Sequence, residues 1–345
     1  MWEACAIDPI SDPEWLVLLD ESPGAEIFHH PAWLDLLRSQ YGYAVGACCV
    51  RNGNGRLEAG IPIARIESRL TGRRLVSLPF SDVCAPALCR DAEPAALTAL
   101  GAAMSAECRR TGLGLAVHAS VPDAPEAFVQ RRFVRHLLPL TDDPAELEQR
   151  YSKSTLRNVR KARREGLRLE RHTDASALDA FYRLHLKTRR RLGVPTQPKR
   201  FIRRFEQLFS GGLGFVATVF DGPRLIAAAV FLTYDGTLTY KYGASDAGAL
   251  AKRPNNLLFA ETIRWACESG LRSVDFGRTD IDNEGLRAFK RSWGAQEVDQ
   301  FYTYLHGAEP SPEQGRRERL VGAAIRHSPA GVGRLAGEAL YRHFG

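Results

Sequence analysis

Apolar and polar residues alternate along this chain with two different periods, and these periods predict its helices and strands. In the first half, residues 31–37 follow a helical period, and the apolar runs 45–50 and 61–66 follow as strands. Asn52-Gly53-Asn54-Gly55 separates the two runs, and these residue types tolerate the positive φ angles of a tight turn. We therefore expect a helix followed by an antiparallel hairpin.

The second half repeats this order. A helical pattern over residues 198–209 precedes the apolar runs 215–220 and 225–232. Asp221-Gly222-Pro223 lies between these runs and again has the composition of a hairpin turn.

Each half then continues with a strand, a helix and a second strand. The two helices end alike, at Cys108 with Gly112 and at Cys267 with Gly270, because glycine suits the left-handed position that stops a helix. The alternative is chance similarity between two ordinary α/β segments. The order of elements predicts an α/β (α+β) fold with a mixed, mostly antiparallel sheet flanked by helices in each half.

Length and composition set the domain organisation. A chain of 345 residues suits two domains, which we place at residues 1–140 and 141–307, followed by a basic helical tail at 308–345. The 44% hydrophobic and 25% charged residues are globular values, which excludes broad disorder. No apolar run approaches the roughly 20 residues that span a bilayer. The start Met1-Trp2-Glu3 does not resemble a signal peptide, so we expect a cytoplasmic protein.

Charge and cysteine usage narrow the partners. The net charge of +7 favours anionic partners such as phosphate groups, nucleic acid or a membrane surface. The seven cysteines are odd in number and form no Cys-x-x-Cys pair, so we expect reduced thiols without disulfides or a zinc site. A catalytic cysteine is the less common alternative. We expect no metal and no tightly bound cofactor.

The segment with the strongest chemical signal runs from Leu238 to Trp293. Its strands and helices place polar residues at strand ends or connections, where ligands bind in α/β sheets: Tyr242, Asp275, Arg278 and Lys290. Pro254-Asn255-Asn256 starts a helix between these strands, and Asn255 is the expected N-cap.

Two of these residues have alternative interpretations. Lys290 is either a cation that stabilises an oxyanion, formed when an amine attacks an ester or thioester, or a solvated surface lysine. Asp275 is either a general base for the amine or the partner of Arg278 in an ion pair, and the residues alone favour the pair.

A second signal is a basic helix over Tyr151–Gly166, with serine at its start and glycine at its end. Its cations recur at i, i+3, i+4 and i+7 and therefore share one face: Arg157, Arg160, Lys161 and Arg164. Such a face either contacts phosphates or is simply solvated. The tail is expected to dock on its own domain, and peripheral attachment to a membrane is the alternative.

At these residues the sequence resembles the Fem-type (FemAB-like) branch of the GNAT acyltransferase superfamily. The likeness rests on short segments that occur in the same order: His30 to Trp33, Gly60-Ile61-Pro62, Ser77 to Asp82, Tyr240 to Asp246, Pro254 to Leu258, Asp275-Phe276-Gly277 and Phe289 to Gly294. The basic segment Tyr151–Gly166 is also similar to one in this family, and the likeness covers residues 28–306.

This resemblance implies two tandem GNAT-like domains and the transfer of an acyl group to an amine by the second domain. Lys290 with Phe289 matches the family's Phe-Lys pair near the reacting ester, which implies that this lysine stabilises the transition state. We therefore expect Lys290, Phe289 and Asp275 as catalytic residues. The expected substrate-binding residues are Tyr242, Asn255, Asn256, Arg278 and Trp293, and the basic face is expected to bind phosphates or tRNA.

Well-understood members of the family take aminoacyl groups from charged tRNA and attach them to the peptide of a cell-wall precursor. This chain lacks the long helical insertion that some tRNA-using members carry as a coiled-coil arm. We favour aminoacyl-tRNA as the donor and a phosphate-bearing envelope precursor or another amine as the acceptor, with no role for DNA.

Two alternatives stay open. The first is an acetyl- or acyl-CoA-dependent N-acetyltransferase, for example in exopolysaccharide biosynthesis, although the slot Ala249–Asn256 lacks the glycine of a pyrophosphate loop. The second is a non-catalytic protein that binds an envelope precursor.

Overall fold

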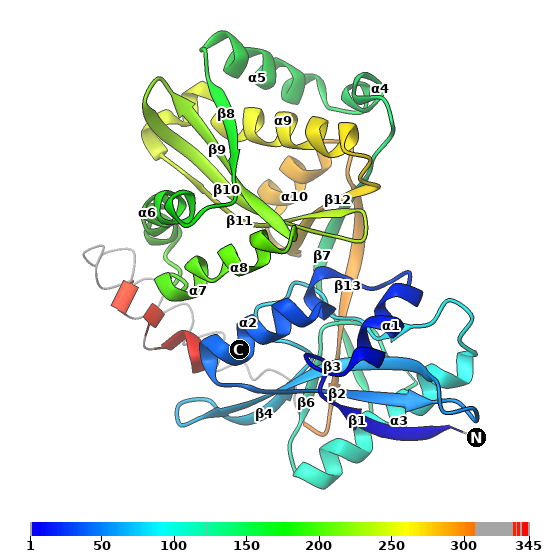
Figure 1. Cartoon of the computed structure of the whole chain (residues 1–345). Helices are drawn as coiled ribbons and strands as arrows, with labels where there is room; N and C mark the ends of the chain where they lie inside the picture. The colour runs from blue at the N-terminus through cyan, green and yellow to red at the C-terminus, as the bar shows by residue number, and fades with distance from the viewer. Residues whose placement is uncertain (1, 122, 308–333, 336, 339, 344–345) are drawn as a thin grey trace. The chain divides into compact units, whose positions relative to one another are not determined.

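The structure, a computed structural model, describes residues 2–121, 123–307, 334–335, 337–338 and 340–343 (Figure 1). These residues divide into two compact units. Unit 1 comprises residues up to 133 with 300–307 and 340–343, and unit 2 comprises residues 134–299 with the described residues of 334–338. Of the predicted basic tail over 308–345, residues 308–333, 336, 339 and 344–345 lie outside the described residues. No helix within the described ranges is long and apolar enough to cross a membrane.

Unit 1 begins with a strand and a helix and then follows the predicted order. Its elements are β1 (Glu3–Ile7), α1 (Pro13–Glu21), η1 (Ile27–His29), α2 (Pro31–Tyr41), β2 (Ala44–Arg51), β3 (Leu57–Ser68), β4 (Gly72–Val76), β5 (Ala87–Leu88), α3 (Pro94–Thr111) and β6 (Leu115–Val117), with parts of β7 (Phe128–Pro139) and β13 (Gln296–Leu305) and the short η3 (Tyr341–His343).

The strands of unit 1 lie in the order β1-β2-β3-β4-β6-β13, and β5 pairs with β3. The pairs are antiparallel except β4 with β6, which is parallel. Helix α3 covers one face of this sheet, and α1 and α2 cover the other (Figure 1). Helices α2 and α3 both end at a glycine in the left-handed conformation, Gly42 with φ 72° and Gly112 with φ 66°.

The segment that follows β4 is bonded to β6 and its continuation. The backbone N–H of His118 donates to Oγ of Ser77 at 2.8 Å, and the N–H of Cys84 donates to the carbonyl of His118 at 3.3 Å. Nε1 of Trp33 adds a hydrogen bond to Oγ of Ser81 at 3.0 Å. The segment after β4 is thus held by hydrogen bonds to other parts of unit 1.

Unit 2 contains the second copy of the repeat, preceded by further helices. Its elements are α4 (Pro144–Gln149), α5 (Lys153–Arg164), β8 (Arg168–His172), α6 (Ala175–Leu192), α7 (Lys199–Arg203), α8 (Phe205–Ser210), β9 (Gly214–Asp221), β10 (Arg224–Tyr234), β11 (Thr237–Ser245), η2 (Ala247–Lys252), α9 (Pro254–Glu268), β12 (Ser273–Asp280) and α10 (Glu284–Arg291). The helix predicted over residues 198–209 is divided into the two short helices α7 and α8.

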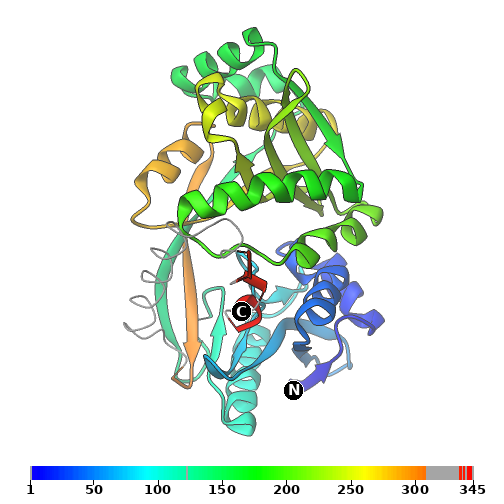
Figure 2. The ribbon, with the colours of Figure 1, turned by 90° about the vertical axis from the view of Figure 1, so that its left-hand side faces the viewer.

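The strands of unit 2 lie in the order β13-β7-β12-β11-β10-β9-β8. Strands β8 to β11 pair antiparallel in chain order, and β11 pairs with β12 in parallel. Figure 2 shows α6 lying across this sheet, and α9 packs on the strands from the other side. The predicted mixed, mostly antiparallel fold with flanking helices is confirmed.

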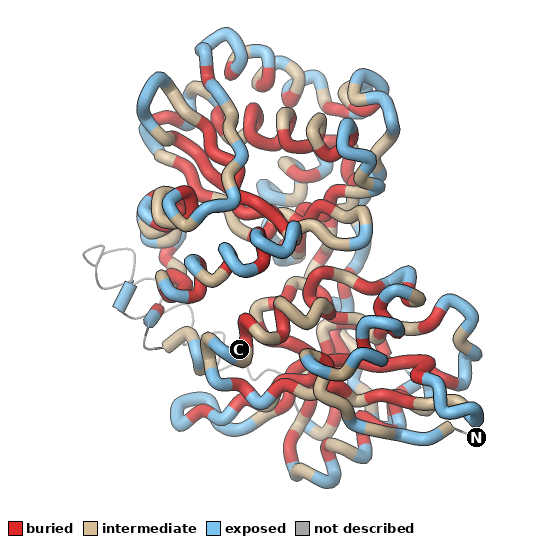
Figure 3. Tube along the Cα trace, viewed as in Figure 1, coloured by how far each residue is buried: buried red, intermediate tan, exposed pale blue. Residues whose placement is uncertain are grey.

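An aromatic cluster forms the core between α9 and the sheet, within the buried interior that Figure 3 shows in red. Phe259 of α9 lies at its centre, with ring centroids 5.0 Å from Tyr240, 5.3 Å from Phe276 and 5.8 Å from Trp293. Trp293 is fully buried and also meets Tyr151 edge-on. The short helix α10 is thereby anchored to the core by the tryptophan that follows it.

Replacing Trp293 with alanine is expected to destabilise the protein by about 3–5 kcal/mol, since a large buried ring is removed and a cavity remains. Chemical denaturation of the variant measures this loss. Trp265→Ala serves as the control and should cost less, because Trp265 is only partly buried. Equal losses for the two variants would contradict the central position of Trp293.

Candidate functional site

The two strands β11 and β12 separate within unit 2. Their parallel ladder joins Thr237–Thr239 with Ser273–Asp275, whereas β11 continues to Ser245 and β12 to Asp280. Backbone groups beyond the ladder are therefore not used between these two strands. We call the point of separation, at Thr239 and Asp275, the fork.

A β-bulge on β11 lies next to the fork. Val230 of β10 pairs with Tyr242 and Phe231 pairs with Tyr240, so Lys241 is the extra residue. Because of the bulge, the side chains of the two neighbouring tyrosines pack against different helices. Tyr240 packs on Phe259 of α9, while Tyr242 lies 5.8 Å from the ring of His185 on α6. Tyr242 is thus near the fork but on the α6 side.

Lys290, on α10, lies against β12 just beyond the fork. Its side chain is buried, with 3% of its surface exposed, and its Nζ donates to the carbonyls of Gly277 at 2.7 Å and Arg278 at 3.2 Å. Two carbonyl dipoles stabilise the positive charge in a place from which water is largely excluded. The interpretation of Lys290 as a solvated surface lysine is therefore wrong.

Asp275 has a partner that the sequence did not indicate. Its Oδ2 accepts hydrogen bonds from Nε and NH2 of Arg135, at 2.9 and 2.7 Å. Its Oδ1 accepts the backbone N–H of Gly277 at 2.8 Å. Arg135 belongs to β7, about 140 residues earlier, so no local pattern links the two.

A second charged group holds α10 through Arg287, one turn before Lys290. Glu297 accepts hydrogen bonds from Nε and NH2 of Arg287 at 2.9 and 2.7 Å, and these lower its pKa to about 2. Nε2 of the fully buried His136 lies 3.1 Å from Oε2 of Glu297. Burial and then the nearby charge of Lys290 lower the pKa of His136 to about 4, so its ring is neutral at pH 7.

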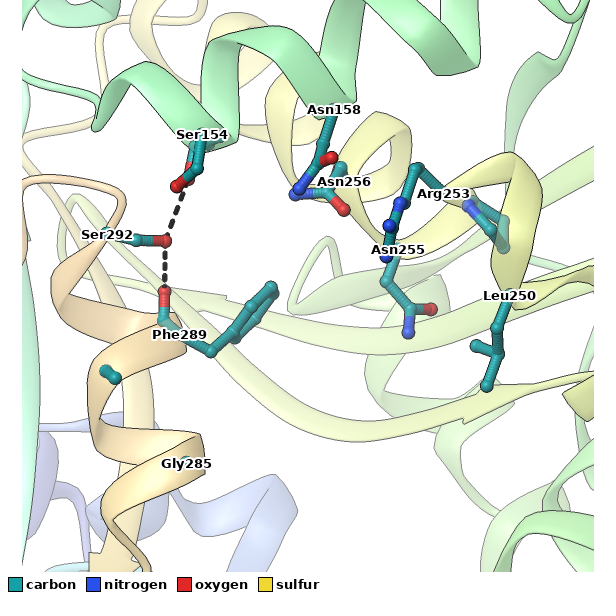
Figure 4. A pocket seen from close by; sticks show the side chains of 12 residues that line it. Ser154, Asn158, Leu250, Arg253, Asn255, Asn256, Gly285, Phe289 and Ser292 are labelled. Atoms are coloured by element: carbon teal, nitrogen blue, oxygen red, sulfur yellow. Dashed lines mark hydrogen bonds between the residues drawn. The ribbon is translucent and has the colours of Figure 1, made fainter.

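A pocket of about 450 Å³ opens between α5, α9 and α10 (Figure 4). Most of its walls are amide, hydroxyl or small side chains: Ser154, Thr155, Asn158, Leu250, Arg253, Pro254, Asn255, Asn256, Gly285, Ala288, Phe289 and Ser292. Arg253 is the one charged residue among these twelve. The predicted residues Asn255, Asn256 and Phe289 come together here.

The N-terminus of α9 forms one wall of the pocket, and the predicted cap was wrong. Helix α9 begins at Pro254, and its N-cap is Arg253 in the left-handed conformation, with φ 63°. Proline is favoured at the first helical position, where the missing N–H costs nothing, so the cap lies before Pro254 and Asn255 falls inside the first turn. Asn255 and Asn256 still face the pocket as lining residues.

Helix α10 contributes residues both to the pocket and to the surroundings of the fork. Gly285, Ala288, Phe289 and Ser292 line the pocket from one helical face, as their spacing of three and four residues requires. Lys290 leaves the helix in a different direction and reaches β12. The predicted residues Lys290, Asp275, Tyr242, Arg278 and Trp293 are not among those that line the pocket.

Helix α5, which carries the predicted basic face, lines the same pocket with Ser154, Thr155 and Asn158. Arg157, Arg160 and Arg164 are exposed and Lys161 is partly buried, and none of the four forms an ion pair with another described residue. Residues 153–172, which comprise α5 and β8, contain eight lysines and arginines but two glutamates. This segment therefore carries six of the seven net positive charges of the chain.

One side-chain cluster in unit 1 has the spacing of metal ligands, namely Glu58, Cys89 and Asp91. NH1 of Arg56 lies 3.7 Å from Glu58 and 3.5 Å from Asp91, so part of the negative charge of these two carboxylates is already offset. Burial raises the pKa of Cys89 to about 12, which keeps the thiol protonated. These residues do not favour a cation.

Comparison with known proteins gives a family match for part of the chain. Residues 149–291 match a family model described as an acetyltransferase (GNAT) domain. No curated protein matches the sequence.

Solved structures share the fold at low identity. FemX is 15% identical, with 87% of this chain and 96% of that chain covered and a TM-score of 0.67. L-PGS from Bacillus licheniformis is 14% identical, with 92% and 98% covered and a TM-score of 0.55. A tandem GNAT protein from the clavulanic acid biosynthesis pathway is 17% identical, with 90% and 100% covered and a TM-score of 0.52.

The buried His136 predicts a pH dependence of stability. Its pKa is lowered to about 4 in the folded protein from 6.5, so the unfolded chain binds the proton more readily between these values. The stabilisation from a neutral His136 is complete above pH 6.5 and is lost as the pH falls towards 4.

Replacing His136 with asparagine should lower the slope of the unfolding free energy against pH between 4 and 6.5. The decrease should be at most about 1.4 kcal/mol per pH unit, which corresponds to one proton. Urea denaturation between pH 4 and 7 measures the slope. His185→Asn offers a comparison, since burial also lowers the pKa of His185, to about 3. An unchanged slope in the His136 variant would show that this ring takes up its proton normally in the folded state.

Proposed function

We propose that this chain, an acyltransferase whose GNAT domain spans residues 149–291, moves an aminoacyl group from charged tRNA to an amine of a cell-envelope or peptide precursor. The observation that carries the proposal is the buried ammonium of Lys290 beside the fork. A fixed positive charge in a largely dry site suits a reaction in which a carbonyl oxygen becomes negative.

The reaction has two steps. The amine nitrogen adds to the ester carbonyl carbon, a C–N bond forms, and the electron pair of the carbonyl moves to its oxygen. Lys290 stabilises this oxyanion until it collapses and the C–O bond to the donor ribose breaks. The proton of the amine goes to the departing ribose oxygen through groups of the substrates, so no protein base is required.

The donor is proposed to approach from the α5 side. The pocket there offers Arg253, the first turn of α9 and several amide groups, and Phe289 of α10 forms a wall near Lys290. Helix α5, which lines the pocket with Ser154 and Asn158, also carries Arg157, Arg160, Lys161 and Arg164, which form no ion pair with another described residue. A compact pyrophosphate needs few such contacts, whereas the backbone of RNA presents many phosphates, so the concentration of charge on α5 and β8 favours RNA.

An acyl-CoA donor is the second candidate. The matching family is described as an acetyltransferase domain, and the structure of the tandem GNAT protein is described as a form without AcCoA. Against this donor, Lys252 of the expected phosphate loop already pairs with Asp221 at 2.7 Å. A cytoplasmic location and the nature of the acceptor stay predictions of the sequence.

Replacing Lys290 with methionine should lower kcat about 100- to 1,000-fold, because the charge is lost while most of the side-chain volume is kept. Single-turnover transfer from the charged donor to an amine measures the effect. Lys241→Met is the matched control, being a second buried lysine near the fork, and should lower kcat less. Turnover at the parental rate in a folded Lys290→Met variant would defeat the proposal.

Replacing Arg157 and Arg160 together with glutamine should weaken tRNA binding and lower the salt dependence of log Kd by about one unit per residue. Binding titrations at several salt concentrations give this slope. Arg200→Gln, an exposed arginine of α7, should leave it unchanged.

Thermal-shift measurements with acetyl-CoA, alongside the tRNA titrations, distinguish the two donors. A ligand that binds the native state raises its apparent stability, so thermal shifts report binding independently of turnover. A shift with acetyl-CoA together with no binding of tRNA would exclude the charged-tRNA donor.

A further inference from the structure

The carboxylate of Asp275 is fully engaged and fully buried. One oxygen accepts two hydrogen bonds from Arg135, and the other accepts the N–H of Gly277. None of the Asp275 surface is exposed. A general base must come within hydrogen-bond reach of the proton that it removes, whereas both oxygens of this buried carboxylate already accept hydrogen bonds from the protein.

Gly277 explains what the pair does instead. Its φ of 70° lies in the left-handed region, which glycine adopts without strain, although it belongs to β12. In a regular extended strand, successive carbonyls point to opposite sides. Here the carbonyls of Gly277 and Arg278 both accept from Nζ of Lys290, and the left-handed turn at Gly277 makes this convergence achievable.

The contacts form one connected chain. Arg135 on β7 fixes the Asp275 carboxylate, Asp275 fixes the N–H of Gly277, and the carbonyl of Gly277 receives the ammonium of Lys290. Every member except the exposed edge of Arg135 is buried, since the Arg135 side chain is 17% exposed and Asp275 is 0% exposed.

We propose that Arg135 and Asp275 are a positioning pair for the reaction: acting through Gly277, they hold the two backbone carbonyls that orient Lys290. This inference rests on the proposed function, because it needs Lys290 to be the group that stabilises the oxyanion. It assigns Asp275 a role other than that of a base.

The test compares Arg135→Gln, Asp275→Asn, their double variant and Lys290→Met, each with the donor that supports turnover in the parent. Arg135→Gln and Asp275→Asn should each lower kcat about 10- to 100-fold with KM nearly unchanged, because Lys290 would be oriented less precisely. The double variant should be no slower than the worse single variant, because both act through the same contact. The pH profile of kcat should keep its midpoints.

Two further variants separate positioning from folding. Arg135→Lys restores the charge and should recover most of the lost kcat. Gly277→Ala leaves the pair intact but strains the left-handed residue, so it should lower kcat to a similar extent. Thermal unfolding identifies any variant that does not fold. If Arg135→Gln or Asp275→Asn does not fold, the kcat of Gly277→Ala is compared with that of the parent instead.

The outcomes are distinct. The positioning role is overturned if Asp275→Asn removes turnover as completely as Lys290→Met and shifts the pH profile while Arg135→Gln does not, since Asp275 then acts on the substrate. It is also overturned if the folded Arg135→Gln, Asp275→Asn and Gly277→Ala variants all retain the parental kcat. Full activity of Lys290→Met instead refutes the proposed function, whatever the pair variants show.

Discussion

A lysine ammonium can be buried only if backbone or side-chain groups replace the water that it loses, and at Lys290 two consecutive carbonyls do so. Burying an ion costs several kcal/mol, so the residues that hold these two carbonyls in place are constrained as well. Gly277 must adopt a positive φ, Asp275 must hold its N–H, and Arg135 must compensate the carboxylate. One turn before Lys290 on α10, Arg287 binds Glu297 and so fastens the same helix to β13. The site is therefore a property of β7, β12, β13 and α10 together.

The two halves of the chain share an order of elements but differ in what surrounds the strands that follow the hairpin. In unit 2 the strands β11 and β12 separate, and a bulge, a buried cation and an adjacent pocket occupy the surroundings. In unit 1 the residues that follow β4, among them Ser77, Ser81 and Cys84, are hydrogen-bonded to neighbouring segments. The buried Lys290 lies in unit 2 and within the range 149–291 that matches the GNAT model.

The repeat, the hairpins and the basic helix were predictable because their signals are local. Gly112 and Gly270 stop α3 and α9 in the left-handed conformation, and Ser152 caps α5, as glycine and serine at those places indicate. The partners of the site were not predictable in this way. Arg135 and Glu297 lie on strands whose neighbours are set by tertiary pairing, and the bulge at Lys241 appears only in the register with β10. The displaced cap at Arg253 shows that a proline in the first turn outweighs the capping preference of Asn255.

Helix α10 has eight residues, and two adjacent side chains on it contact different parts of unit 2: Phe289 lines the pocket and Lys290 binds β12. An α-helix advances by about 100° per residue. A one-residue insertion or deletion between the cap at Asn283 and Phe289 would therefore turn the ammonium away from its carbonyls and the ring out of the pocket wall. Chains descended from a common ancestor of this one can vary in composition along α10 but not in its length, so gaps in their alignment should avoid this helix even where identity is low.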